Sequence, residues 1–133
     1  MIDDKNSVEN TVSREHVQKE LAKFHLELAT REDALASAFH FDERDAVRPS
    51  YENLIRLPSI HDELLEQLKS AHPLFESQGP ASAAAHNETI RLVDEIMAVL
   101  RDMSVGIDHY TRLHSKLTRL KYELRDAIAR LGE

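Results

Sequence analysis

The sequence predicts an all-α protein, an antiparallel and coiled-coil-like bundle of three long helices, or of four if the last helix breaks near Gly106. Two observations predict this class. The 133 residues are rich in Leu, Ala, Glu and Arg but contain only three Gly, four Pro and no Cys or Trp. Apolar residues also recur every three or four positions, which is the period of one face of an α-helix, and no stretch shows the alternation of a strand.

The longest apolar stripe runs through residues 81–131. Its members after the first turns are Ile90, Val93, Met97, Leu100, Met103, Ile107, Tyr110, Leu113, Leu117, Leu120, Leu124, Ala127 and Leu131. A helix of about 50 residues would be about 75 Å long. Gly106 is its weak point, because glycine costs roughly 1 kcal/mol inside a helix. The stripe nevertheless crosses Gly106 without losing phase, and we therefore favour one continuous, bent helix.

Two shorter helices are expected before this one. The first spans about 10–40, and the second, about 49–71, should be kinked or broken at Pro58. Residues 1–10 are expected to be flexible. A loop rich in proline and glycine follows at 73–80, with Leu74 and Phe75 tucked under the end of the bundle. The whole chain, 1–133, is expected to form a single helical-bundle domain.

The helix lengths predict a protein partner. The first two helices would cover about 45 Å and about 30 Å, which leaves part of the last apolar stripe bare. A homodimer or a client helix from another protein could cover it by helix packing. Basic residues beside the stripe would then steer an acidic partner segment. The predicted partner-binding residues are Ile107, Tyr110, Leu113, Leu117, Leu120 and Leu124 on the stripe, with the bases Arg112, Lys116, Arg119 and Lys121.

Composition and charge argue against several other classes. Without cysteine the chain has no disulfide and no thiolate site. It lacks the apolar run of about 20 residues that a membrane span needs, and its acidic, polar N-terminus is unlike a signal peptide. The net charge is −7, and few aromatic residues lie among the bases, which argues against nucleic-acid binding. These features predict a cytoplasmic protein.

The motifs give little support to catalysis. The eight histidines form neither the Glu-x-x-His pairs of di-iron bundles nor a His-x-x-x-His pair, and there is no nucleophile elbow or phosphate loop. We therefore expect no catalytic residue, no metal site and no cofactor. His61 lies on an apolar seam and is expected to be a hydrogen-bonded core histidine. Three alternatives stay open: a metal-linked regulator, a phosphotransfer-linked one using His86 or His114, and a HEPN-like ribonuclease using Arg56 and His61.

Three features resemble the FlgN-type flagellar export chaperones. A first amphipathic helix ends in the charged break Phe41-Asp42-Glu43-Arg44-Asp45. A second ends Ile60-His61-Asp62-Glu63-Leu64-Leu65-Glu66-Gln67-Leu68, and the last has an early Asn87 before Ile90, Leu92 and Val93. The resemblance covers roughly residues 15–103, whereas the prolines of the second helix and the basic C-terminus depart from it. It implies a small, non-enzymatic cytosolic chaperone that binds the C-terminal helices of hook-associated subunits before secretion.

Overall fold

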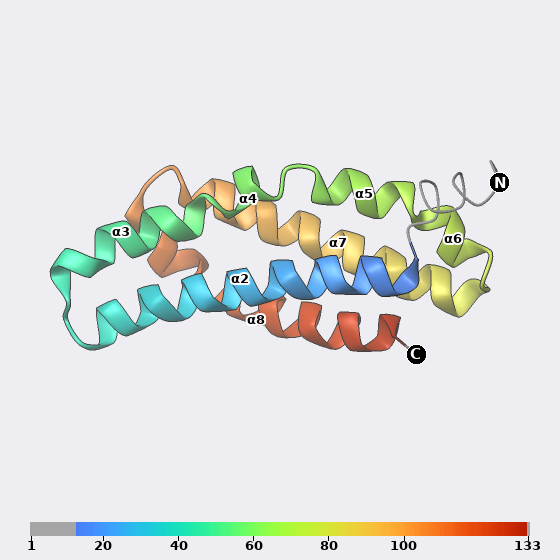
Figure 1. The fold of residues 1–133 in the computed structure, drawn as a ribbon. Helices are drawn as coiled ribbons and strands as arrows, with labels where there is room; N and C mark the ends of the chain where they lie inside the picture. The colour runs from blue at the N-terminus through green and yellow to red at the C-terminus, as the bar shows by residue number, and fades with distance from the viewer. Residues whose placement is uncertain (1–12, 133) are drawn as a thin grey trace.

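The structure, a computed structural model, describes residues 13–132. Its helices form an antiparallel bundle in which the chain runs the length of the molecule four times, and each run is called a pass below (Figure 1). The predicted all-α bundle is confirmed, and no strand occurs in this part of the chain. The prediction for residues 1–10 falls outside the described residues. The helices are α2 (Arg14–His40), α3 (Arg44–Ile55), α4 (Leu57–Ile60), α5 (Leu64–Ser70), α6 (His72–Glu76), α7 (Pro80–Met103) and α8 (Ile107–Leu131).

Both ends of α2 are fixed by local hydrogen bonds. Ser13 precedes the helix, and its hydroxyl accepts a hydrogen bond from the backbone N–H of His16 at 3.0 Å, which satisfies one of the free donors of the first turn. After the helix, Asp42 adopts a left-handed conformation with φ of 54°. The N–H of Glu43 then reaches back to the carbonyl of Ala38 at 2.8 Å. Aspartate tolerates this conformation better than most residues, and the chain turns directly into α3.

The second pass is a series of short helices, α3 to α6, rather than one rod. Its break at Pro58 confirms the predicted interruption, because Pro58 lies in the first turn of α4, where its missing N–H is not needed. The pass begins earlier than predicted, at Arg44, and α3 continues through Pro49. At its far end Phe75 is fully buried, as predicted, while Leu74 is half-buried.

The prediction of a continuous last helix is wrong. α7 ends at Met103, the chain reverses over 104–106, and α8 runs back along α7 (Figure 1). The hydroxyl of Tyr51 in α3 donates toward the carbonyls of Met103 and Gly106, the latter at 2.9 Å. Both carbonyls also accept backbone N–H groups of the turn, those of Gly106 and His109, so the phenol adds a side-chain contact that ties α3 to the reversal. An unbroken phase across Gly106 does not show continuity, because two antiparallel helices can each turn an apolar face to one core.

The reversal buries most of the stripe within a single chain. α8 packs against both α7 and α2, and Leu117, Leu120 and Leu124 are at most 1% exposed. The 25 residues of α8 make a helix of about 38 Å, close to the lengths of α2 (about 40 Å) and α7 (about 36 Å). The length mismatch expected from the sequence therefore does not exist. The uncovered apolar edge that predicted a partner was a consequence of treating α7 and α8 as one helix.

At the opposite end, α2 binds the C-terminus of α8. The Nη2 of Arg14 donates to the carbonyl of Leu131 at 2.7 Å, and the Nε2 of Gln18 donates to the carbonyl of Ile128 at 3.1 Å. These two bonds occupy carbonyls in the last turn of α8 and set the register of α8 on α2. None of the helices within residues 13–132 is long and apolar enough to cross a membrane.

We predict that Leu117→Ala destabilises the monomer. Leu117 is fully buried between helices, and deleting its side chain should lower the free energy of unfolding by about 2–5 kcal/mol. Leu26→Ala is the matched control, because Leu26 is 66% exposed and its loss should change stability by less than about 0.5 kcal/mol. Urea unfolding and light scattering measure both effects. A variant of unchanged stability that alters the oligomeric state would show that the stripe is an interface.

Candidate functional site

The ten predicted partner-binding residues do not form one exposed surface in the structure, because some are buried in the core and others lie on the outside of α8. Tyr110, Leu117, Leu120 and Leu124 belong to the core, and Leu113 is half-buried against it. Of the apolar six, only Ile107 is substantially exposed, at 42%. The bases Arg112, Lys116 and Arg119 are exposed on α8, but Lys121 is buried. Most of the apolar members are therefore enclosed by their own chain, and in this fold they pack into the bundle and do not form an exposed stripe.

Lys121 binds an acid of its own chain instead of a partner. Its Nζ lies 2.6 Å from the Oε1 of Glu32 in α2, and both side chains are at most 10% exposed. Burial favours the neutral amine, but the hydrogen bond and charge of Glu32 outweigh this and raise the pKa of Lys121. The sequence signal for this pair was the gap in the apolar pattern of the first helix at 31–32, where an acid occupies a position facing the core.

We predict that Lys121→Met destabilises the protein by about 3–5 kcal/mol at pH 7, because it leaves the carboxylate of Glu32 buried without a partner. The double variant Glu32→Leu/Lys121→Met should recover most of this loss in urea unfolding. Arg119→Met is the control, since its pair with Glu123 is exposed and should contribute less than about 1 kcal/mol. A Lys121→Met protein as stable as the control would contradict a structural role for the pair.

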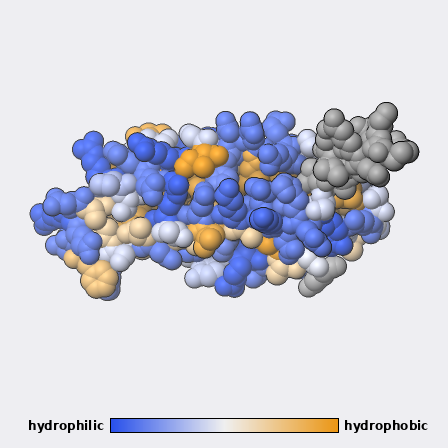
Figure 2. Space-filling view, viewed as in Figure 1, coloured by the Kyte–Doolittle hydropathy of each residue, from blue (hydrophilic) through white to orange (hydrophobic). Residues whose placement is uncertain are grey.

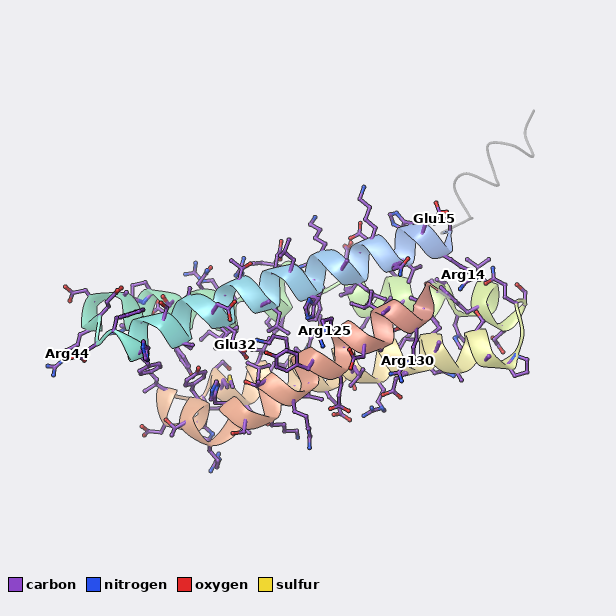
Figure 3. All side chains as sticks on the ribbon, turned by 90° about the horizontal axis from the view of Figure 1, so that it is seen from below. Arg14, Glu15, Glu32, Arg44, Arg125 and Arg130 are labelled. Atoms are coloured by element: carbon purple, nitrogen blue, oxygen red, sulfur yellow. The ribbon has the colours of Figure 1, made fainter. Side chains whose placement is uncertain are left out.

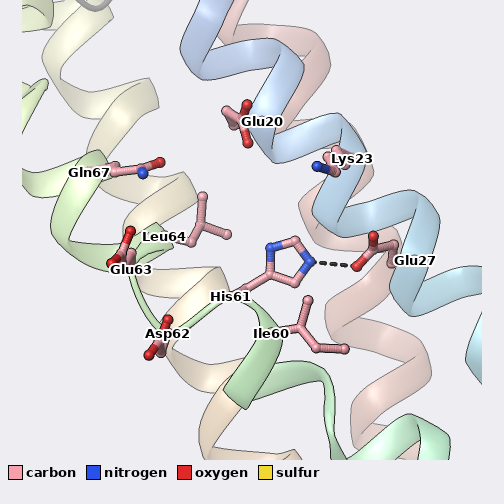
Figure 4. Close-up of a pocket in the computed structure, with 9 residues that line it drawn as sticks. All are labelled: Glu20, Lys23, Glu27, Ile60, His61, Asp62, Glu63, Leu64 and Gln67. Carbon is pink, nitrogen blue, oxygen red and sulfur yellow. Dashed lines mark hydrogen bonds and ion pairs between the residues drawn. The ribbon is translucent and has the colours of Figure 1, made fainter.

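His61 confirms the prediction of a hydrogen-bonded histidine. Its Nε2 lies 2.6 Å from the Oε2 of Glu27 (Figure 4). The rings of His61 and Phe24 are perpendicular, with their centroids 5.1 Å apart. A cleft of about 180 Å³ lies beside it, lined by charged side chains of α2 and of the α4–α5 turn. Arg56 is exposed, and no hydrogen bond among the described residues joins it to His61.

A contact between two histidines joins α6 to α7. The Nδ1 atoms of His72 and His86 are 2.9 Å apart, and the ring of Phe75 stacks on His86 with a centroid separation of 4.1 Å. His86 is fully buried, so its ring nitrogens are closed to a phosphotransfer partner in this fold. Burial, helped by the nearby His72, lowers the pKa of His86 to about 4. His86 is thus a structural residue whose imidazole is uncharged at neutral pH.

We predict that acid weakens this contact. The imidazole of His86 takes up a proton below about pH 6.5 when unfolded but only near pH 4 when folded. The unfolded state therefore binds more protons in this window, and the free energy of unfolding should fall by up to about 3 kcal/mol as the pH drops from 6.5 to 4. The free energy of unfolding should fall less steeply between pH 6.5 and 4 in His86→Gln than in His16→Gln, a control at an exposed position. Equal slopes would contradict the assignment of this pH dependence to His86.

An apolar groove lies between α2 and α8 near the α2–α3 turn. It has a volume of about 410 Å³. The ring of Phe39 stacks on that of Tyr110 at 5.6 Å, yet Phe39 remains 46% exposed, and Phe41 in the following turn is 64% exposed. Figure 2 shows apolar surface at this end of the bundle, on the left of the view. The lining residues are Ala36, Phe39, His40, Tyr110, Thr111 and His114.

The groove holds one polar atom with an unmet hydrogen-bonding capacity. The Nδ1 of His114 is buried and has no hydrogen-bond partner among the described residues. Its ring lies 5.2 Å from that of Tyr110. Burial, together with the charge of Glu32, raises the pKa of Tyr110 to about 12, so its hydroxyl stays protonated. The groove is therefore a mainly apolar concavity whose wall holds two phenyl-type rings, of Phe39 and Tyr110, and the imidazoles of His40 and His114.

Comparison with protein-family models, with curated proteins and with solved structures finds no match. Within residues 13–132, no group of three or more His, Asp or Glu side chains is arranged to hold a metal ion. Of the surfaces described above, the groove between α2 and α8 is the one that combines exposed aromatic side chains with a concave shape.

Proposed function

We propose that the protein is a non-enzymatic helical module that binds an amphipathic helix of a partner protein in the groove between α2 and α8. The observation that carries this proposal is the exposure of Phe39 at an apolar groove, with a second exposed aromatic, Phe41, in the turn that follows α2. Large aromatic side chains are enriched at the centres of protein interfaces, where a partner removes them from water. A chaperone of the FlgN type in the cytoplasm is one specific form of this proposal.

The groove fits the side chains of a helix better than a compact ligand. It lies along two neighbouring helices, with Ala36 and Phe39 one turn apart on α2 and Tyr110 and His114 one turn apart on α8. A partner helix presents apolar side chains at the same spacing of three or four residues, so two or three of them can enter a groove of this kind. The stacking of Phe39 on Tyr110 also holds the aromatic wall in place before binding, which reduces the entropy lost in the complex.

The charges favour a basic partner segment, in contrast to the acidic one expected from the sequence. Tyr110, Thr111 and His114 line the groove, which places Arg112 and Lys116 on another side of α8. The exposed acids Asp33 and Glu43 lie instead on and just after α2. With a net charge of −7, the protein attracts a basic helix and repels a second copy of itself.

The test is a titration of the isotope-labelled protein with two amphipathic helical peptides that share one apolar face and differ only in carrying Lys or Glu on the other. We predict tighter binding of the basic peptide, with NMR shifts centred on Ala36, Phe39, Thr111 and His114. Phe39→Ser should weaken binding about tenfold, because it removes the main exposed aromatic contact, which corresponds to about 1.4 kcal/mol.

Leu26→Ser is the matched control, because Leu26 is an exposed apolar residue of the same helix that does not line the groove. It should leave the affinity unchanged. Equal loss in both variants would indicate nonspecific apolar binding and contradict the proposal. A dimer seen by light scattering and abolished by Phe39→Ser would show that a second copy fills the groove, which also overturns the proposed partner.

A further inference from the structure

A second cavity lies at the opposite end of the bundle from the groove, where α2 begins, α7 begins and α8 ends. Its volume is about 390 Å³. Two arginines, Arg14 and Arg130, contribute to its wall, and Figure 3 shows both near the C-terminus of α8. No acidic side chain lines it. The lining residues are Arg14, Gln78, Ala81, Ser82, Ala85, Arg130 and Leu131.

The positive charge of the two arginines is not cancelled by an ion pair within residues 13–132. Arg14 donates through Nη2 to the carbonyl of Leu131, which is a neutral acceptor, and its buried Nε has no partner among the described residues. Arg130 makes no salt bridge to a described acid. Its charge reaches Glu88, whose pKa is lowered chiefly by the hydrogen bond from Arg91 and additionally by Arg130.

The start of α7 adds donors to the same cavity. Gly79 precedes the helix and supplies no side-chain cap, and Pro80 has no N–H. The first backbone donor paired in this turn is the N–H of Ala83, which binds the carbonyl of Gly79, so the N–H groups of Ala81 and Ser82 remain available. The Oγ of Ser82 is itself buried without a hydrogen-bond partner in the described part of the chain.

We propose that this cavity binds the phosphate group of a small phosphate-bearing molecule. Two guanidinium groups, a hydroxyl and the positive end of the α7 dipole supply charge and hydrogen-bond donors for an oxyanion. The hydroxyl of Ser82 gains the acceptor that it lacks in the free protein. A cavity of about 390 Å³ also leaves room for more than the phosphate itself. This inference is independent of the groove and of the partner proposed for it.

The experiment is a calorimetric titration of the full chain with inorganic phosphate at constant ionic strength, with NMR to locate the site. We expect one saturable site per chain and shifts at the N–H groups of Ala81 and Ser82. Arg130→Gln should weaken binding at least about tenfold, because a charged hydrogen bond is lost. Ser82→Ala should weaken it about threefold or more, without loss of the fold as judged by circular dichroism.

Arg119→Gln is the matched control, because it removes the same charge from an exposed position of the same helix outside the cavity. It should change the affinity less than twofold. The proposal is overturned if phosphate shows no saturable binding, if Arg119→Gln weakens binding as much as Arg130→Gln, or if acetate binds as tightly as phosphate. The first result denies a site, the second assigns the effect to net charge, and the third assigns the cavity to carboxylates.

Discussion

The structure depends on the enclosure of one apolar stripe by the chain that carries it. Leu117, Leu120 and Leu124 must leave water, and the reversal between α7 and α8 brings them against both α7 and α2. The other contacts follow from this arrangement. Tyr51 can reach the carbonyls at the reversal only because α8 turns back there, and Lys121 meets Glu32 only because α8 lies beside α2. Burial of apolar area supplies the driving force, and the polar contacts select one register.

Helix periodicity predicted the class of fold and several helix ends, because the apolar pattern reports directly which face is buried. The end of α2 and the break at Pro58 could be predicted since both have local causes, a charged break and a proline. The reversal near Gly106 could not, because periodicity records the face of a helix and not its direction in space. A three-residue turn leaves almost no trace in such a pattern. The expectation of an exposed stripe on the last helix followed from that single ambiguity.

The candidate sites were harder to predict because they depend on residues far apart in the sequence. The groove joins Phe39 to Tyr110, and the arginine-lined cavity joins Arg14 to Arg130. Neither pair is recognisable before the order of the four passes is known. The histidines show the opposite case. The apolar position of His61 indicated a structural role, and its hydrogen bond to Glu27 agrees with that interpretation.

The hydrogen bond from Arg14 to the carbonyl of Leu131 joins the beginning of α2 to the end of α8. An even number of passes brings the beginning of α2 and the end of α8 to one pole, and the turn after α2 and the reversal after α7 to the other (Figure 1). The aromatic groove lies toward the pole of turns, and the cationic cavity lies at the pole of chain ends. The two candidate sites therefore lie near opposite ends of the bundle and share no lining residue, so a substitution in one leaves the contacts of the other in place.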